Sequence, residues 1–395
     1  VLTCALPIFV KERKRNMVRK TVMKVTFDLI VAAIIILTLW VYNYKIPRAG
    51  IKEVNFQNYL AQHDMGENRD VWQGSTEAGQ GSGESGGSQE QIGQTVGTTE
   101  QKQDESYPDG LQRTKIKKDS KDWHKKFADK FSDKVEVTDT SYKSPDLSIE
   151  LSFHQYDSGI LDKTSSGRHL QYGTNISYVV ADIYIGDITC LQTAFAQDTY
   201  GIGYTEKLTD MSKRLNAAFA INGDSYSNNQ HQNNGTIIRN GVIYRDKPTD
   251  AETCVLNWDG TIDIYQPDEI DTQTLIDKGA YQSWIFGPSL LDKNGKAKDK
   301  FLTWDYIRES HPRTAIGYYE PGHYCILLVD GRQQASRGMF LDEMAAVFEN
   351  LGCKQAYNLD GGHCSFMTMQ SQVVNHPYKP EHEIEDAIML MDGVK

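Results

Sequence analysis

The fold prediction begins with residues 324–362, YCILLVDGRQQASRGMFLDEMAAVFENLGCKQAYNLDGG. The apolar run 324–329 predicts a strand, LDEMAAVFENLG (341–352) predicts a helix that Gly352 caps, and 355–359 predicts a second strand. A strand, a helix and a strand in this order are typical of a βαβ unit inside a mixed sheet. We therefore predict an α+β fold, a mixed β-sheet domain with packed helices.

Outward from this stretch, the sequence remains richer in strand patterns than in helix patterns. Asn240-Gly241 and Asp259-Gly260 each separate two apolar runs and predict hairpins. One further helix is expected over 205–215. Other strands are predicted at 147–156, 176–185, 217–222, 283–291 and 314–319. Residues 136–395 therefore form one predicted domain, which is long enough to bury an ample core.

The N-terminal part of the chain predicts a membrane anchor. VTFDLIVAAIIILTLWVY (25–42) is strongly apolar, and as a helix it spans roughly 27 Å, close to the thickness of the hydrocarbon layer. We predict a transmembrane helix over 25–44. A cleaved signal peptide is the alternative, but no A-x-A-like cleavage site follows the apolar run.

The segment before the anchor, 1–24, is basic. The positive-inside rule places it in the cytoplasm and everything after residue 45 outside, so a single-pass protein of the cell membrane is expected. Met17 is the first methionine and opens a sensible anchor sequence. Residues 1–16 are therefore left out of the fold prediction as a candidate gene-calling artefact.

Two segments connect the anchor to the domain. Residues 45–110 are predicted to be a flexible linker, because 74–100 is rich in Gly, Ser, Gln and Glu and holds few apolar residues. Residues 111–135 predict an amphipathic helix, with aromatic side chains four residues apart at Trp123, Phe127 and Phe131. Packing of this helix on the following domain is the preferred interpretation, and contact with an anionic surface is the alternative.

Charge and cysteine usage narrow the class of protein. The net charge of −11 and the absence of a basic stripe outside the N-terminus argue against a nucleic-acid partner. The six cysteines show no CxxC spacing. Five of them follow the anchor, and an odd number cannot all pair internally. We expect most of them to be small buried apolar residues.

Four short stretches share a pattern, in which a hydrophobic strand ends in polar residues and glycine. They are FAINGDSYS (219–227), HPRTAIGYY (311–319), LLVDGRQ (327–333) and NLDGGHCSFM (358–367). Each alone is usually a hairpin or an Asx-turn. Together they predict a ligand site at the rim where the strands end. The glycines that would let the backbone approach a ligand are Gly223, Gly331, Gly361 and Gly362.

These stretches resemble the phosphodiester glycosidase family, which includes the lysosomal uncovering enzyme that removes N-acetylglucosamine from a mannose-phosphate diester. The clearest matches are RTAIGYY, FGPSLL, AINGD with GTIIRNGVIYR, and the long run from LLVDGR to AYNLDGG, all within 217–369. The whole of 145–392 is compatible. The anchored form with a glycine-rich tether looks like members from Gram-positive bacteria. The resemblance implies extracytoplasmic hydrolysis of the bond between the anomeric carbon of a sugar and a phosphate diester.

The sequence departs from the family pattern at two turns. Members commonly carry NLDGGGSS, whereas His363 and Cys364 stand here in place of a glycine and a serine. The first turn is often NGG followed by aromatics, whereas Asp224 follows Asn222 and Gly223 here. His363 is therefore the residue whose role the resemblance does not supply. It could protonate or bind a leaving phosphate, although a surface or core histidine is commoner.

Carboxylates at the strand ends supply candidate catalytic groups. Asp330 and Asp360 end two predicted strands, and if these strands are neighbours their carboxylates flank one bond, as in glycosidases. Asp224 is a third candidate. The competing interpretation is a Ca²⁺ or Mg²⁺ site built from Asp224, Asp330, Asp360 and Asn222, although no cofactor is required by the sequence. Cys364 as a nucleophile is disfavoured, since it would need a base and an electropositive setting.

Arginines and a helix terminus supply candidate anion contacts. Arg313 and Arg332 could clamp the phosphate, with a structural ion pair as the alternative for each. Ser336 and Arg337 are expected to begin the helix after the LLVDGR turn and to give a second phosphate contact. Asn222 could hydrogen-bond the substrate or cap a turn.

The predicted function is an extracytoplasmic hydrolase that cleaves the glycosidic bond of a sugar-1-phosphodiester in cell-wall or exopolysaccharide-type substrates. The first alternative is a non-catalytic protein of the same fold that binds glycans or takes part in polysaccharide assembly. The second is a metal-dependent phosphodiesterase that cleaves the P–O bond.

Overall fold

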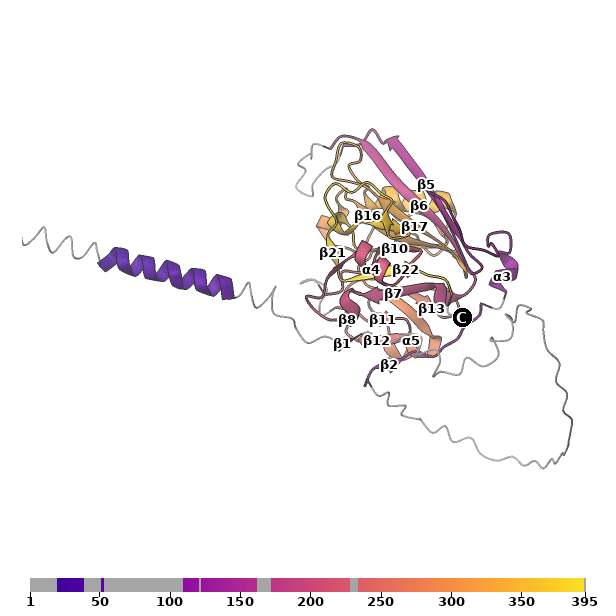
Figure 1. Cartoon of the computed structure of the whole chain (residues 1–395), viewed down its shortest axis with the longest axis horizontal. Helices are drawn as coiled ribbons and strands as arrows, with labels where there is room; N and C mark the ends of the chain where they lie inside the picture. The colour runs from indigo at the N-terminus through magenta and orange to yellow at the C-terminus, as the bar shows by residue number, and fades with distance from the viewer. Residues whose placement is uncertain are drawn as a thin grey trace, which may run out of the picture. The chain divides into compact units, whose positions relative to one another are not determined.

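The computed structural model describes residues 20–38, 51–52, 109–120, 122–161, 172–227 and 234–393. The chain forms two units, one that contains the helix Lys20–Thr38 and one that contains the β-sheets (Figure 1). The predicted basic segment before residue 20, the end of the predicted anchor at 39–44 and most of the predicted linker lie outside the described residues.

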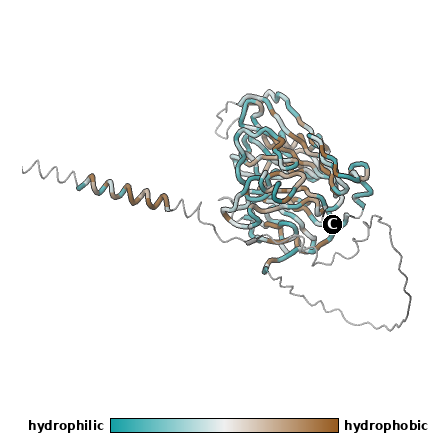
Figure 2. The backbone as a smooth tube through the Cα atoms, viewed as in Figure 1, coloured by the Kyte–Doolittle hydropathy of each residue, from teal (hydrophilic) through white to brown (hydrophobic). Residues whose placement is uncertain are grey.

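The helix Lys20–Thr38 is long and apolar enough to cross a membrane, by length and composition. Its 19 residues rise about 29 Å, which matches a hydrocarbon layer of about 30 Å. Figure 2 shows that its N-terminal end is hydrophilic, where Lys20 and Lys24 lie, and that the remainder is hydrophobic. The predicted span coincides with this helix over 25–38.

The largest sheet of the domain has seven strands. In spatial order they are β18 (Gln355–Asn358), β16 (Arg313–Glu320), β17 (His323–Val329), β6 (Asn175–Ile185), β5 (Leu147–Asp157), β4 (Ser141–Lys143) and β3 (Glu136–Val137). Neighbouring strands in this sheet are antiparallel. The long β5–β6 pair crosses the domain in Figure 1.

The strand–helix–strand unit predicted from 324–359 is present, as β17, α6 (Leu341–Leu351) and β18. Gly352 caps the helix with a left-handed φ of 81°, as expected. Both β17 and β18 pair antiparallel with β16, so they are parallel to each other with one strand between them. The α+β fold is therefore confirmed.

Successive side chains along β16 and β17 point to opposite faces of the large sheet, and both faces are buried. Ala315 and Leu327 belong to one apolar cluster, together with Phe348 of α6. Ile316 and Ile326 belong to a second cluster, which strands of the other sheets complete. Since both faces are covered, the strands read as continuous apolar runs in the sequence.

The contact between α6 and the sheet depends on a glycine. A Cβ on Gly317 would lie 2.7 Å from both the Sγ of Cys325 and the ring of Phe348, so this position has no room for a side chain. The Sγ atoms of Cys325 and Cys353 are 3.6 Å apart. Of the five described cysteines, all are free and four are buried, which agrees with the prediction that they pack as small apolar residues.

Smaller sheets complete the domain. A five-stranded sheet has the order β20 (Gln372–Val373), β19 (Met367–Met369), β10 (Phe219–Asn222), β22 (Asp386–Leu390) and β7 (Leu191–Phe195). Two three-stranded sheets have the orders β11 (Ile237–Arg239), β12 (Val242–Arg245), β2 (Gln112–Arg113) and β14 (Ile262–Tyr265), β13 (Thr253–Asn257), β15 (Ala280–Trp284). The two predicted hairpins are therefore confirmed as β11–β12 and β13–β14.

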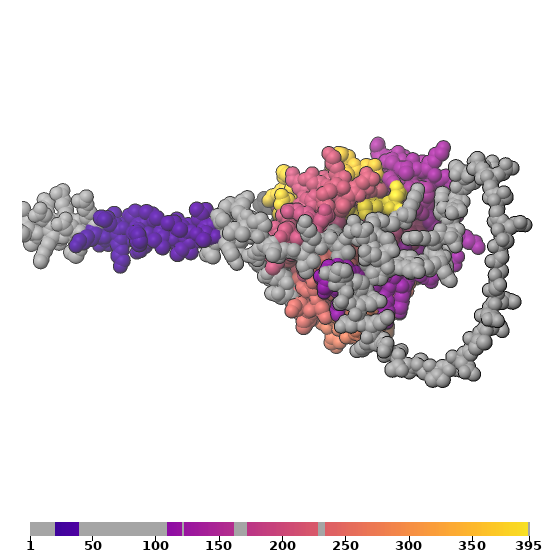
Figure 3. Space-filling model, turned by 60° about the horizontal axis from the view of Figure 1, so that its bottom comes forward, coloured from indigo at the N-terminus to yellow at the C-terminus, as the bar shows by residue number. Residues whose placement is uncertain are grey.

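Short elements lie between these strands. The helix expected over 205–215 is α4 (Leu208–Arg214), and the residues before it form β9 (Glu206–Lys207), which pairs with β21 (Glu383–Ile384). This pairing brings the yellow C-terminal segment beside the pink one in Figure 3. The remaining elements are α5 (Thr272–Lys278), β1 (Ile51–Lys52), β8 (Thr199–Tyr200), η2 (Ile188–Cys190), η3 (Ala196–Asp198), η4 (Asp305–Arg308) and η5 (Gly362–Cys364).

The prediction of an amphipathic helix over 111–135 is wrong. Only α3 (Trp123–Lys126) is α-helical there, and the residues before it are extended. The cause is tertiary: β2 pairs with β12, and the Lys115 N–H donates to the carbonyl of Ile276 in α5, so these backbone groups bond to distant parts of the chain instead of to one another. Trp123 and Phe127 are buried in the main core, as the packing interpretation expected.

Candidate active site

Three of the four polar turns meet at Pro312. The Gly362 N–H donates to the Pro312 carbonyl over 2.8 Å. A Cβ on Gly331 would lie 2.6 Å from the Pro312 nitrogen, and one on Gly361 would lie 2.7 Å from its carbonyl oxygen. Gly331 and Gly361 therefore allow the chain to pack against its own backbone, and this packing holds the three turns together at one edge.

The remaining turn joins them through Asn222, at the end of β10. Its Nδ2 donates to the backbone carbonyl of Asp360 over 2.7 Å, and its Oδ1 accepts from the hydroxyl of Thr314 over 2.7 Å. Asn222 is buried, so its amide links β10 to the two turns at β16 and β18. Gly223 packs on Asp386, because a Cβ there would lie 2.6 Å from its Oδ1 atom.

The side chain of Asp360 lies where these turns meet. The residue as a whole is half-buried, but its carboxyl group lies deep enough that burial raises its pKa to about 6. Hydrogen bonds from Cys364 and from the Gly361 N–H, which is 2.8 Å from Oδ1, oppose this rise. Cys364 thus donates to Asp360, and its own pKa is raised by burial and by that carboxylate, which makes it a poor nucleophile.

A second carboxylate, Glu385, faces the same place and escaped the sequence prediction. Burial raises its pKa to about 7, and the charges of Asp386 and Asp360 add to the rise, while hydrogen bonds from the hydroxyl and N–H of Ser227 oppose it. Glu385 immediately precedes β22, whose start pairs with the end of β10. The acidic pair Glu385-Asp386 at the start of an apolar strand is the sequence signal for this residue, whereas the predicted site residues follow strand ends.

Arg332 is the arginine that faces this pair. Its guanidinium donates to the hydroxyl of Tyr378 over 2.8 Å and lies close to Gly362, where a Cβ would be 3.2 Å away. Its positive charge lowers the pKa of Asp360. Arg332 has a left-handed φ of 57°, an uncommon conformation for a residue with a side chain. The turn thus directs this side chain toward the carboxylates.

Two histidines flank the arginine. The Nε2–H of His311 donates to the Tyr306 carbonyl over 2.7 Å, which leaves Nδ1 to accept from Arg332 over 3.3 Å. Burial and the charge of Arg313 lower the pKa of His311 to about 4, so it is neutral at physiological pH. His363 contacts the carbonyl of Pro380 through Nε2, with its ring 5.6 Å from that of Tyr378.

Asp224 lies in a different, fully buried network. Its carboxylate accepts from the N–H groups of Ile285 and Phe286 over 2.6 and 3.0 Å. Arg239 lies 3.8 Å from it and binds Asp386 more closely, at 2.6 Å. Burial raises the pKa of Asp224 to about 7 against the pull of Arg239. Asp224 therefore holds the first turn to the segment directly after β15, and the structure does not bring it together with Asp360.

Asp330 is also separated from Asp360, because their strands are not neighbours. β16 lies between β17 and β18, so two strand spacings of about 4.8 Å separate the two strand ends. The Asp330 carboxylate is buried and accepts from the Asn375 amide at 2.9 Å and from the His376 N–H at 3.1 Å. The condition for the predicted carboxylate pair, that the strands of Asp330 and Asp360 are neighbours, is therefore not met.

Arg313 does not reach the site as a phosphate ligand. Its guanidinium is buried and donates to the carbonyls of Met339, Ile307 and Glu309. Burial and the charge of Arg332 lower its pKa to about 9. Arg313 therefore connects the loop before β16 to the loop before α6. The alternative prediction for Arg313 was a structural ion pair with a carboxylate, whereas its partners here are backbone carbonyls.

Ser336 and Arg337 are structural as well. The Ser336 hydroxyl donates to the Asp330 carbonyl over 2.6 Å. Arg337 is fully buried and pairs with Glu343 of α6 through both nitrogen atoms of its fork. The helix begins at Leu341, so the prediction that Ser336 and Arg337 begin it is wrong.

The oxygen donors proposed for a metal ion are divided among three networks. Asp224 binds backbone N–H groups near Arg239, Asp330 binds Asn375, and Asp360 faces Glu385. Within the described ranges, no group of three or more His, Cys, Asp or Glu side chains could hold a metal ion.

The polar turns lie in the part of the chain that matches a known protein family. Residues 215–391 match the family model of the phosphodiester glycosidases. This match confirms the resemblance found in the sequence. All predicted site residues and Glu385 lie inside the matched range.

Individual proteins that resemble this chain match parts of it. The SPbeta prophage-derived uncharacterized protein YomE of Bacillus subtilis (strain 168) is 34% identical over 181 residues, 45% of this chain and 28% of YomE. The chain thus spans little more than a quarter of that relative. The zebrafish N-acetylglucosamine-1-phosphodiester alpha-N-acetylglucosaminidase catalytic domain, auto-inhibited by its pro-peptide, has a TM-score of 0.48 and 20% identity, covering 62% of this chain and 83% of that one. A hypothetical protein from Synechocystis has a TM-score of 0.39 and 15% identity, covering 62% of each chain.

Proposed function

We propose that the domain hydrolyses the glycosidic bond of a sugar-1-phosphodiester. The observation that carries the proposal is that Asp360 interacts with Arg332 and with Glu385 at the edge where the polar turns meet. Two carboxyl groups and one cation are what this reaction needs, namely an acid, a base and a partner for the phosphate. The match of 215–391 to the phosphodiester glycosidases supports the same reaction.

The two carboxyl groups have different roles. Glu385, with the higher pKa of about 7, carries the proton and gives it to the departing phosphate oxygen. Asp360, with a pKa of about 6, is ionised near neutral pH and takes a proton from the attacking water. The water oxygen bonds to the anomeric carbon while the bond from that carbon to the phosphate oxygen breaks, so the products are a sugar and a phosphate monoester.

Arg332 holds the diester phosphate. Its guanidinium has five donors, of which one is used by Tyr378 and one by His311, so further N–H groups remain for phosphate oxygens. The neutral His311 fixes the guanidinium without competing for the anion. His363, on the η5 turn beside Arg332 and Tyr378, is assigned to the rim that contacts the leaving group.

The proposed substrates are cell-wall or exopolysaccharide-type polymers outside the cytoplasm. The helix Lys20–Thr38 acts as an uncleaved anchor whose basic N-terminal side is cytoplasmic, which puts the domain outside the membrane. A domain held in this way meets surface polymers rather than cytoplasmic metabolites. The relationship to phosphodiester glycosidases supports a carbohydrate substrate.

We further propose that the reaction needs no metal ion. The carboxylates that would bind Ca²⁺ or Mg²⁺ are committed to backbone N–H groups, Asn375 and Arg239 in separate networks. EDTA should therefore leave the rate unchanged. A rate that EDTA abolishes and Ca²⁺ or Mg²⁺ restores would overturn this part of the proposal.

The full chain in detergent, incubated with UDP-N-acetylglucosamine and with methyl diesters of sugar 1-phosphates in H₂¹⁸O, tests the reaction. We expect the ¹⁸O label on the sugar, since water attacks the anomeric carbon. Asp360→Asn and Glu385→Gln should each lower kcat/KM by about 10²–10⁴-fold, the usual contribution of an acid or base. Mass spectrometry of the products measures both the position of the ¹⁸O label and the rate of product formation.

Glu383→Gln is the matched control, because Glu383 is exposed, lies two residues from Glu385 and should leave the rate unchanged. Label on the phosphate would show P–O cleavage and contradict the proposal. Absence of turnover for every diester would favour a non-catalytic glycan-binding protein instead.

A further inference from the structure

A cavity of about 450 Å³ lies at the opposite end of the five-stranded sheet from the carboxylates. Ala218, directly before β10, and Met391, directly after β22, line it, whereas Asn222 and Glu385 mark the other ends of these strands. At about 3.3 Å per residue, the two places are roughly 13–20 Å apart along the strands. The volume is within the range of small-molecule sites, about 300–1,000 Å³.

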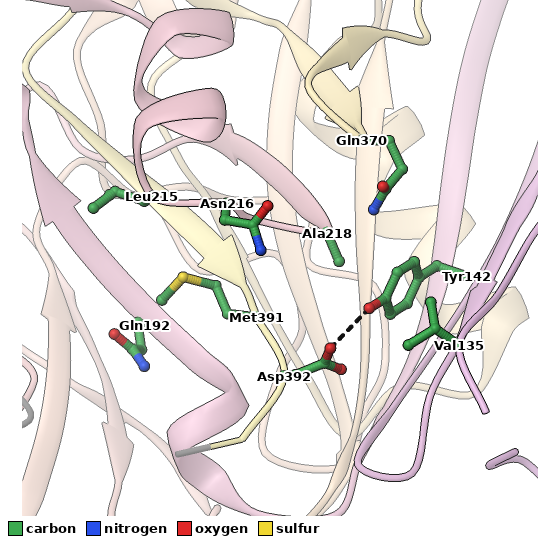
Figure 4. Close-up of a pocket in the computed structure, with 9 residues that line it drawn as sticks. All are labelled: Val135, Tyr142, Gln192, Leu215, Asn216, Ala218, Gln370, Met391 and Asp392. Carbon is green, nitrogen blue, oxygen red and sulfur yellow. Dashed lines mark hydrogen bonds between the residues drawn. The ribbon is translucent and has the colours of Figure 1, made fainter. Parts of the chain in front are cut away.

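Side chains that form hydrogen bonds surround this cavity. Figure 4 shows Asn216, Gln370, Tyr142 and Asp392 around one space, below the helix α4. The Tyr142 hydroxyl donates to Oδ2 of Asp392 over 2.9 Å. The side-chain amides of Asn216 and Gln370 form no hydrogen bond with the part of the chain that the structure describes. Together they offer donors and acceptors to a ligand.

The charge of the lining excludes an anion. No Lys, Arg or His is among the described lining residues, and Asp392 contributes a carboxylate. The phosphate part of a substrate is therefore disfavoured here, in contrast to the surroundings of Arg332. A metal ion is disfavoured too, because one carboxylate and neutral amides do not form an adequate set of hard ligands.

The lining fits a polyhydroxylated neutral ligand. A pyranose has hydroxyl groups at its rim and apolar C–H faces. Amide and carboxylate oxygens bind adjacent hydroxyl groups, while the Tyr142 ring and the apolar side chains Leu215, Val135 and Met391 suit the C–H faces. The amides and the carboxylate thus suit the hydroxyl groups of a sugar, and the tyrosine ring suits its apolar face.

The fold does not require the two amides. Asn216 follows α4 and Gln370 lies in the turn between β19 and β20, each with a left-handed φ, 53° and 50°. Glycine is the residue that adopts this conformation most readily, so at both positions the backbone would tolerate glycine. Asparagine also tolerates a left-handed φ after a helix, so the turn accounts for Asn216, whereas the amide of Gln370 is an addition that its turn does not explain.

We propose that this cavity is a second carbohydrate site, which binds one neutral sugar ring of a glycan chain at a distance from the carboxylates. The site goes beyond the proposed hydrolysis and does not depend on it. It holds a surface polymer by a sugar unit that is not cleaved. The match to a glycosidase family assigns no such site.

The test is saturation-transfer NMR on the full chain in detergent with four neutral disaccharides, namely cellobiose, maltose, lactose and N,N′-diacetylchitobiose. We expect at least one to receive saturation from the wild-type chain. The double variant Asn216→Gly/Gln370→Gly should bind that disaccharide at least tenfold more weakly. Ser371→Gly is the matched control, because Ser371 also has a left-handed φ, 61°, in the same turn but does not line the cavity.

The outcomes separate this site from the proposed function. Hydrolysis of UDP-N-acetylglucosamine should be equal in the wild type and the double variant. If hydrolysis fails but the disaccharide binds and the double variant loses it, the cavity proposal stands alone. No saturation transfer from the wild type to any of the four disaccharides, or equal affinity in the double variant, would overturn it.

Discussion

Asp360 and Glu385 differ in the hydrogen bonds that compensate their burial. Glu385 accepts hydrogen bonds from one residue, Ser227, and two neighbouring carboxylates raise its pKa. Asp360 accepts hydrogen bonds from Gly361 and Cys364, and the positive charge of Arg332 lowers its pKa. Both pKa values are raised by burial, but that of Asp360 remains about 6 and that of Glu385 about 7. Two interacting carboxyl groups separated in this way suit an acid and a base.

These values predict a narrow pH optimum for kcat/KM, between about 6 and about 7. Below about pH 6, Asp360 takes up a proton and no longer serves as base. Above about pH 7, Glu385 loses the proton that it would donate. A pH profile of UDP-N-acetylglucosamine hydrolysis by the full chain checks this. Glu385→Gln should lower the rate and remove the alkaline decline, and a flat wild-type profile from about pH 5 to about pH 8 would contradict the assignment.

The packing of α3 and Phe127 on the sheets explains why this segment belongs to the domain. The ring of Trp123 lies against Gly260 of the β13–β14 turn and Gly322 of the β16–β17 turn, where an added Cβ would collide with it. Phe127 packs beside it, with its ring 5.1 Å from that of Tyr184 on β6. A short α3 thus fastens this segment to two sheets, although its sequence pattern predicted a much longer helix.

Trp123→Ala should lower the free energy of unfolding by about 3–5 kcal/mol, because it removes a large buried side chain and leaves a cavity. Urea unfolding of the full chain, followed by circular dichroism, measures the loss. Lys125→Ala in the same helix is the control and should change it by less than about 0.5 kcal/mol, since Lys125 is exposed. Equal effects of the two variants would mean that the segment is not part of the cooperative domain.

At the scale of the whole molecule, an apolar helix and a β-sheet domain that matches the phosphodiester glycosidase model occur in one chain. The helix has the length of a bilayer core, the whole chain has a net charge of −11, and the candidate site lies on turns at one sheet edge. In the proposed function, anchoring would keep the domain near surface polymers, and the second sugar site would hold such a polymer in place while the carboxylates act.

Ile34→Lys should release the chain from membranes, because a lysine near the middle of a spanning helix costs about 2.5–3.5 kcal/mol. The share of the chain that remains in carbonate-washed membranes measures the effect. Thr21→Lys is the control, since Thr21 lies at the basic end beside Lys20 and should leave membrane association unchanged. Protease added to intact cells should digest the anchored domain, and protection of it would contradict the proposed orientation.

Local patterns were sufficient for the elements of the fold. The strand–helix–strand unit from 324–359, the hairpins at Asn240-Gly241 and Asp259-Gly260 and the cap at Gly352 are short-range features, because period, turn residues and caps depend on near neighbours. The same patterns located the polar turns and the role of Asp360 in them. They failed for 111–135, where pairing with β12 overrides the helical period.

Long-range pairing decided which of these residues share a site. β16 enters between β17 and β18 and so separates Asp330 from Asp360. The antiparallel pairing of β22 with β10 carries Glu385 to the carboxylate that the sequence left without a partner. The sequence alone thus established the α+β class, the family resemblance and the turns. Only the tertiary structure brings Glu385 into electrostatic contact with Asp360 and separates the strand of Asp330 from that of Asp360, because strand order is set by contacts between residues far apart in the chain.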